Sequence, residues 1–88
     1  MDMDIMVIGQ KLDRVKRNID FFIKHVSNEN NALALGKLSN LMLDIESLET
    51  DKIISLMMFI DYLMTSYQRF RFPYDLLLET YIILQSMI

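Results

Sequence analysis

The sequence contains no cysteine, a single histidine, a single proline and two glycines. Without cysteine, the chain can form neither a disulfide framework nor a thiolate zinc site. Gly9 and Gly36 stand alone, so the glycine-rich loop that cradles a phosphate group is missing as well. These absences exclude disulfide-stapled domains, cysteine-ligated zinc proteins and phosphate-loop proteins.

Strand signals and long apolar runs are also missing. No segment sustains the alternation of a strand, and no Asn-Gly hairpin turn occurs. The longest apolar stretches, 53–64 and 76–88, are shorter than the roughly 18 to 20 residues of a membrane span. Asp2 and Asp4 stand where a secretory signal would be basic. The sequence therefore predicts a cytoplasmic protein built without strands.

Four segments of the chain show helical spacing instead. Apolar residues recur every three or four positions, which indicates amphipathic helices over about 5–27, 32–48, 51–69 and 73–87. The first seam consists of Ile8, Leu12, Val15, Ile19, Phe22 and Val26. Short connections force neighbouring helices to run in opposite directions. We therefore expect one all-α domain, an antiparallel up-down four-helix bundle.

Local signals suggest where these helices begin and end. Thr50 is a candidate N-cap for the third helix. Pro73 fits only the first turn of a helix or a position outside one, so Phe72 is expected to end the corner before the fourth helix. Gly36 is interpreted as a site of close helix-helix approach.

Residues that could carry catalysis are few. Catalysis needs a nucleophile with a base, a pair of differently tuned carboxylates or a metal cluster. His25 lies beside Lys24 at a predicted helix end, where a cation interacts favourably with the last carbonyl groups. Asp44 and Glu46 are two positions apart and point to different sides of a helix. We expect no catalytic residue, no metal site and no cofactor, and hence no enzyme.

The second half of the chain carries more apolar residues than one buried stripe holds. In the last predicted helix they are Leu76, Leu77, Leu78, Tyr81, Ile82, Ile83, Leu84, Met87 and Ile88. Surplus apolar surface of this kind is typical of contact with a partner or with a second copy. The sequence thus favours an interaction protein.

The segment before and around Pro73 leads to a family resemblance. Residues 66–75 read S-Y-Q-R-F-R-F-P-Y-D, after an apolar helix that ends in Y-L-x-x-S-Y at 62–67. A helix with Leu77, Tyr81 and Gln85 follows. With these features, 53–88 resembles helices three and four of the immunity proteins that protect Gram-positive bacteria against pediocin-like (class IIa) bacteriocins. The first half matches only in the placement and length of its helices.

The resemblance implies a small antiparallel four-helix bundle without catalytic activity. It further implies action from the cytoplasmic side, at the inner face of the membrane, on the bacteriocin-occupied mannose-phosphotransferase permease. Specificity would reside in the C-terminal half. The partner-binding residues implied there are Tyr67, Arg69, Phe70, Arg71, Phe72 and Tyr74 at the corner, with Ile82 and Ile83 on helix four.

Two other interpretations of the sequence stay open. One is a small regulatory or inhibitory adaptor, phage-encoded or transcription-linked, that forms a homodimer through helix four. The other is nucleic-acid binding through the corner arginines and the basic side of the first helix, Lys11, Arg14, Lys16 and Arg17. It is the least favoured, because Asp13 and Asp20 are interspersed and the net charge is −3. These basic residues, like the acidic ones at 44–51, are interpreted as solvated surface.

Overall fold

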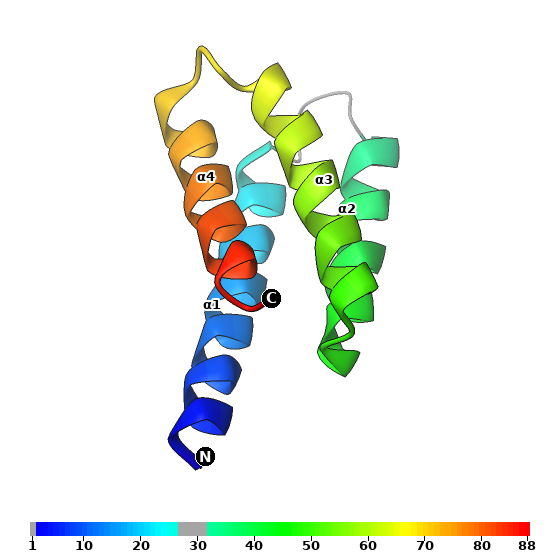
Figure 1. Ribbon diagram of the computed structural model, residues 1–88. Coiled ribbons are helices and arrows are strands. Elements are labelled where there is room, and N and C mark those ends of the chain that lie inside the picture. Colours follow the sequence, from blue (N-terminus) through cyan, green and yellow to red (C-terminus); the bar gives the residue numbers. More distant parts are fainter. Residues whose placement is uncertain (1, 27–31) are drawn as a thin grey trace.

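The computed structural model describes residues 2–26 and 32–88, with side chains from Val7 onward in the first helix. It contains α1 (Asp2–Val26), α2 (Ala32–Asp44), α3 (Thr50–Ser66) and α4 (Arg71–Gln85), with a short 3-10 turn, η1 (Ile45–Ser47), between α2 and α3. The described residues include no strand. Successive helices alternate in direction (Figure 1). The predicted all-α, up-down four-helix bundle is confirmed.

Each helix packs against two neighbours, so the four form a closed ring. α1 contacts α2 and α4, and α3 contacts the same two helices from the other side. The N-terminal part of α1 extends beyond the other helices (Figure 1), which fits the elongated extents of 43 × 22 × 19 Å. The two helices of the resemblance, α3 and α4, therefore lie side by side as a hairpin.

The core is built mainly by three of the helices. The seam of α1 is buried as expected from Val15 onward, while α2 contributes only one fully buried side chain, Leu38. Burial of this apolar surface is the main force that stabilises the bundle. The core residues are Val15, Ile19, Phe22, Val26, Leu38, Ile45, Ile53, Leu56, Met57, Ile60, Leu63, Met64, Tyr67, Leu77 and Leu84.

The corner between α3 and α4 differs from its prediction. α3 ends at Ser66 rather than at residue 69, and α4 begins at Arg71 rather than at Pro73. Phe70, with φ −113° and ψ 95°, is the extended residue that turns the chain, so Phe72 is already helical. Pro73 fits the third position of α4 because first-turn N–H groups have no intrahelical partner. The connection thus lies earlier in the chain than expected, at 67–70 rather than 70–72, and it is one residue longer.

The connection between α2 and α3 also differs. The second helix was expected to reach residue 48, but α2 ends at Asp44, and Leu48 has a left-handed backbone with φ 60°. Its N–H donates to the carbonyl of Ile45 at 2.9 Å. Glu49, not Thr50, is the N-cap of α3. Left-handed caps usually carry glycine or asparagine, so nothing in the sequence indicated this turn.

The N-terminal helix is longer than its prediction, because it begins at Asp2 rather than near residue 5. Its last described residue is Val26, so the predicted end at residue 27 lies outside the described residues. The seam of this helix continues to the end of the described segment, which brings Phe22 and Val26 into the core near the α3–α4 corner.

Gly36 does not mark a close approach between helices. A methyl group added to its Cα would meet nothing within 4 Å. Gly36→Ala should therefore raise the free energy of unfolding by up to about 1 kcal/mol, since alanine has the higher helix propensity. Urea unfolding measures this, and Gly9→Ala, in equally open space on α1, is the matched variant. A lower midpoint for Gly36→Ala would contradict the open environment.

Candidate interaction surfaces

Aromatic side chains gather at one end of the bundle, where the α3–α4 connection meets the C-terminal part of α1. The ring of Phe72 lies 5.5 Å from the ring of Phe21 and 5.0 Å from that of His25, measured between centroids. Phe70 and Phe72 are 60% and 47% exposed, and Phe21 and His25 are exposed too. We call Phe21, His25, Phe70 and Phe72 the aromatic corner.

Tyr67 supports this corner from beneath. Its ring makes edge contacts with Phe22, at 5.3 Å, and with Phe70, at 6.2 Å. The side chain is buried among the core residues. The prediction that Tyr67 touches a partner does not fit this position, because Tyr67 continues the buried stripe of α3, seven residues after Ile60 and three after Met64. Tyr67 links the exposed Phe70 to the core instead.

Two arginines flank the aromatic corner. Arg69 is exposed, and the side chain of Arg71 is 96% exposed, with Asp75 Oδ2 3.9 Å from its Nε. An exposed pair at that distance stabilises little. Arg71 lies in the first turn of α4, where the helix dipole disfavours a cation. The stability of α4 therefore gives no reason for an arginine at this position.

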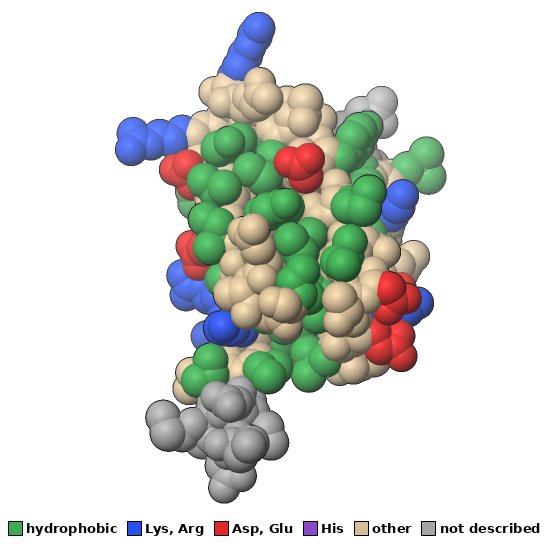
Figure 2. Space-filling model, viewed as in Figure 1, with side chains coloured by type: hydrophobic (Ala, Val, Ile, Leu, Met, Phe, Trp, Pro, Cys, Tyr) green, Lys and Arg blue, Asp and Glu red, His purple; other side chains and the backbone are tan. Residues whose placement is uncertain are grey.

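The other predicted contact residues divide between core and surface. Tyr74 and Ile83 are half-buried against the core, whereas Ile82 is exposed on the outer side of α4, about three turns from the corner. Hydrophobic side chains extend along the face that α3 and α4 form, with most charged side chains at its margins (Figure 2). Ile82 thus belongs to a wider apolar face rather than to the aromatic corner.

Phe21 and His25 were not among the predicted contact residues. His25 lies in the last turn of α1, as expected, and its ring in addition packs on Phe72. Phe21 precedes Phe22 of the core seam and so falls on the outer side of α1. A large aromatic residue off the seam was the available signal, whereas its contact with α4 depends on the tertiary packing.

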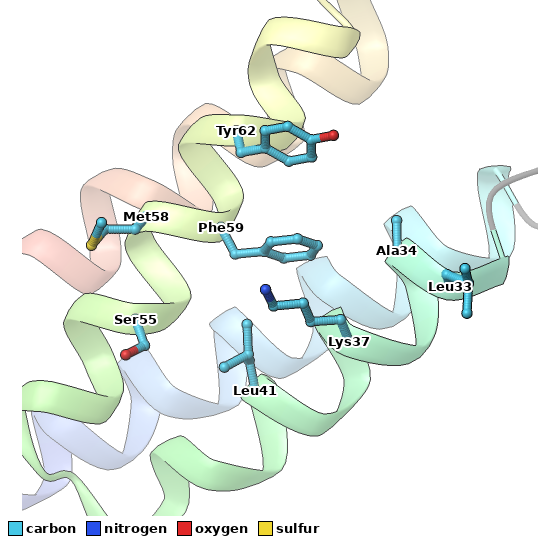
Figure 3. A pocket seen from close by; sticks show the side chains of 8 residues that line it. All are labelled: Leu33, Ala34, Lys37, Leu41, Ser55, Met58, Phe59 and Tyr62. Atoms are coloured by element: carbon cyan, nitrogen blue, oxygen red, sulfur yellow. The ribbon is translucent and has the colours of Figure 1, made fainter.

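A second surface is an open groove between α2 and α3, with a volume of about 820 Å³. Phe59 and Tyr62 project from α3 toward α2, and their rings stack at 5.9 Å and 24° (Figure 3). The ammonium group of Lys37 lies 5.0 Å from the ring centre of Phe59. We call this the α2–α3 groove, and its lining residues are Leu33, Ala34, Lys37, Leu41, Ser55, Met58, Phe59 and Tyr62.

Three of the four residues on the basic side of α1 pair with carboxylates, and the fourth, Lys11, lies 3.5 Å from the carbonyl oxygen of Ser86. Arg14 Nε lies 2.8 Å from Glu79 Oε1, and Arg17 pairs with Asp13 at 2.8 Å. Lys16 pairs with Glu46, so the basic and acidic regions meet across the bundle in addition to facing solvent. Cations that are already paired are poor ligands for phosphate groups. This arrangement does not favour a nucleic-acid site on α1.

Glu79 gives a pH-dependent contribution to stability. Its hydrogen bond from Arg14 lowers the pKa of the carboxyl below 4.5, with smaller effects from burial, which opposes the change, and from Asn18. A carboxyl whose pKa is lowered in the folded state stabilises the protein at pH values above its ordinary pKa. This contribution to stability is lost as the pH falls through the lowered pKa. We expect Glu79→Gln to flatten the loss of stability below pH 4.5, by less than about 1 kcal/mol because the pair is exposed. Thermal unfolding at pH 3 to 7 measures this, and an unchanged acid limb would contradict it.

The described residues hold no group of three or more His, Cys, Asp and Glu side chains that could bind a metal ion. None of the described helices combines the length and the apolar character of a membrane-spanning segment. The fold and its surfaces thus define a four-helix bundle with exposed apolar side chains at the aromatic corner, in the α2–α3 groove and along the face of α3 and α4. Comparison with protein-family models, curated proteins and solved structures finds no match.

Proposed function

We propose that the chain is a non-enzymatic protein-binding module and that the aromatic corner, with Arg69 and Arg71, is its contact surface. The observation that carries this proposal is the clustering of exposed Phe21, Phe70 and Phe72 at the end of the bundle that bears two exposed arginines. Aromatic residues and arginine are enriched where proteins contact partners, and they supply much of the binding energy.

The corner is also held in place before a partner arrives. Phe70 rests on Tyr67, which rests on Phe22 of the core, and Phe72 lies between Phe21 and His25. Side chains that are already ordered lose little conformational entropy on binding. Such anchors are suited to a specific contact rather than to a loose one.

The particular role that we propose is immunity against a pediocin-like bacteriocin. Two observations support it: the fold agrees with the four-helix bundle that the resemblance of 53–88 implies, and Arg69 to Phe72 lie within the resembling segment. In this role the hairpin of α3 and α4 acts from the cytoplasm, at the inner face of the membrane. Its target is the mannose-phosphotransferase permease that a bacteriocin occupies.

The test is protection of living cells. The chain is expressed in a bacteriocin-sensitive strain, which is then challenged with a panel of class IIa peptides. We expect protection against at least one peptide, and loss of protection when Phe70→Ala and Phe72→Ala are combined, since hot-spot aromatics typically contribute tenfold or more to affinity. Leu43→Ala, an equally exposed site on α2, is the control.

Three outcomes would overturn parts of this proposal. Absence of protection against every peptide, with the chain folded and expressed, removes the immunity role. Crosslinking from the corner that recovers a soluble polymerase, nuclease or regulator instead of the permease identifies the chain as an adaptor. Full protection by the corner variant would show that the contact surface lies elsewhere.

A further inference from the structure

The α2–α3 groove is lined by a second seam on each of its helices. On α3 the lining residues Ser55, Met58, Phe59 and Tyr62 follow the spacing i, i+3, i+4, i+7. On α2 the residues Leu33, Lys37 and Leu41 follow i, i+4, i+8. This spacing places each set along one side of its helix. Both helices therefore present a face to the groove in addition to the face that they bury in the core.

The core of the bundle does not require the exposed members of these seams. α3 already buries Ile53, Leu56 and Ile60 on its inner side. Met58 and Tyr62 are 69% and 64% exposed, and Leu33 is exposed almost completely. Contiguous apolar residues that remain in contact with water are typical of a surface that a partner covers.

The shape of the groove fits a helix better than a small molecule. The seams 33–41 and 55–62 each extend about 10 to 12 Å, which is about two helical turns. The groove is open along its length (Figure 3), whereas a pocket for a small ligand encloses about 70 to 90% of the ligand surface. An amphipathic helix that lies in a groove needs only one of its faces covered.

Lys37 is the charged residue among those that line the groove. Its ammonium group lies over Phe59, and it forms no ion pair with the described residues. A cation at an apolar surface gains most from a carboxylate that binds beside it, and contact with the ring does not prevent that pairing. Charge complementarity therefore favours an acidic partner.

We propose that the α2–α3 groove binds an amphipathic helix of a partner protein, with an acidic residue beside its apolar face. The apolar face of that helix packs on Phe59 and Tyr62, and the acidic residue pairs with Lys37. The groove consists of α2 and α3, whereas Phe21, His25 and Phe72 of the aromatic corner lie on α1 and α4. The inference is therefore independent of the proposed function.

Selection from a peptide library tests the proposal. The full chain is the target for a phage-displayed library of 14-residue helical peptides with randomised exposed positions. We expect the selected peptides to share apolar residues at i, i+3, i+4 and i+7 and an adjacent Asp or Glu. Tyr62→Glu should weaken their binding tenfold or more, because it places a carboxylate in the groove.

Three variants provide the matched comparisons. Leu43→Glu introduces the same charge at an equally exposed site of α2 outside the groove, and it should leave peptide binding within about twofold. Lys37→Glu should reverse the charge preference, so that peptides with Lys in place of the acidic residue bind better. Combined Phe70→Ala and Phe72→Ala should leave peptide binding unchanged, whatever the corner does for protection.

Four other outcomes would overturn the proposal or assign the groove to a different occupant. Selected peptides that bind Tyr62→Glu as well as the parent chain would overturn the proposal, as would a charge preference that Lys37→Glu leaves unaltered. Displacement of the peptides by dodecanoate at low concentration would assign the groove to a fatty acid. Self-association that light scattering detects, and that Tyr62→Glu abolishes, would assign the groove to a second copy of the chain.

Discussion

Phe22→Ala is expected to lower the free energy of unfolding by about 3 to 5 kcal/mol. Phe22 is a fully buried side chain of α1, and its ring makes an edge contact with Tyr67 at 5.3 Å. The substitution removes both the buried ring and the contact that holds Tyr67. A bundle of this length has roughly 4 to 13 kcal/mol of stability, so a large share would be lost.

Phe21→Ala is the matched control for this prediction. The ring of Phe21 is exposed, and among the described aromatic rings it contacts only that of Phe72, which is exposed as well. Its loss should lower the free energy of unfolding by at most about 1.5 kcal/mol, the upper range for an aromatic pair. Urea unfolding monitored by circular dichroism compares the two variants. Equal losses would contradict the assignment of Phe22 to the core and Phe21 to the surface.

Leu38→Ala is expected to lower the free energy of unfolding by about 2 to 5 kcal/mol and to release α2 before the other helices. Leu38 is the only fully buried side chain of α2, a helix of 13 residues. The other apolar contacts of α2, such as Leu35 and Met42, are only partly buried. Helices of this length are marginal in water without packing.

Hydrogen exchange under native conditions distinguishes local release from global unfolding. In Leu38→Ala, the amides of α2 should exchange faster than those of α3 and α4, because the opening of α2 exposes little of the remaining core. Leu33→Ala, at an exposed position of the same helix, should leave the exchange pattern unchanged. Equal acceleration in all four helices would show that α2 unfolds only together with the bundle.

The sequence predicted the number and direction of the helices because the core seams obey one spacing rule. Val15, Ile19 and Phe22 are spaced for one side of a helix, and all three are buried. Helix ends were less predictable, because the rule constrains helix interiors. The left-handed position at residue 48 is occupied by leucine rather than by the usual glycine or asparagine, so the sequence did not indicate this turn. Pro73 is compatible with both the expected and the observed start of α4.

The candidate site was predictable only in part, because the spacing within one helix does not show which helices pack together. Phe70 and Phe72 could be suspected from their neighbours in the chain, whereas Phe21 reaches Phe72 only through the packing of α1 on α4. Tyr67 faces inward because it continues the buried stripe of Ile60 and Met64 past the end of α3 at Ser66. The α2–α3 groove requires two faces from different helices, and neither spacing alone shows that these faces meet.

The polar contact between α1 and α4 has a consequence for helix register. Asn18 is buried, and its amide donates to Glu79 Oε1 at 3.4 Å, the oxygen that Arg14 also contacts. A slide of α1 by one turn would keep apolar residues facing apolar residues but would bury the amide without a partner, at a cost of about 1 to 3 kcal/mol. Phe21 and His25 lie one and two turns beyond Asn18 on α1. Both meet Phe72 in the register in which this amide is paired, so the alignment of α1 on α4 that satisfies Asn18 is also the one that forms the aromatic corner.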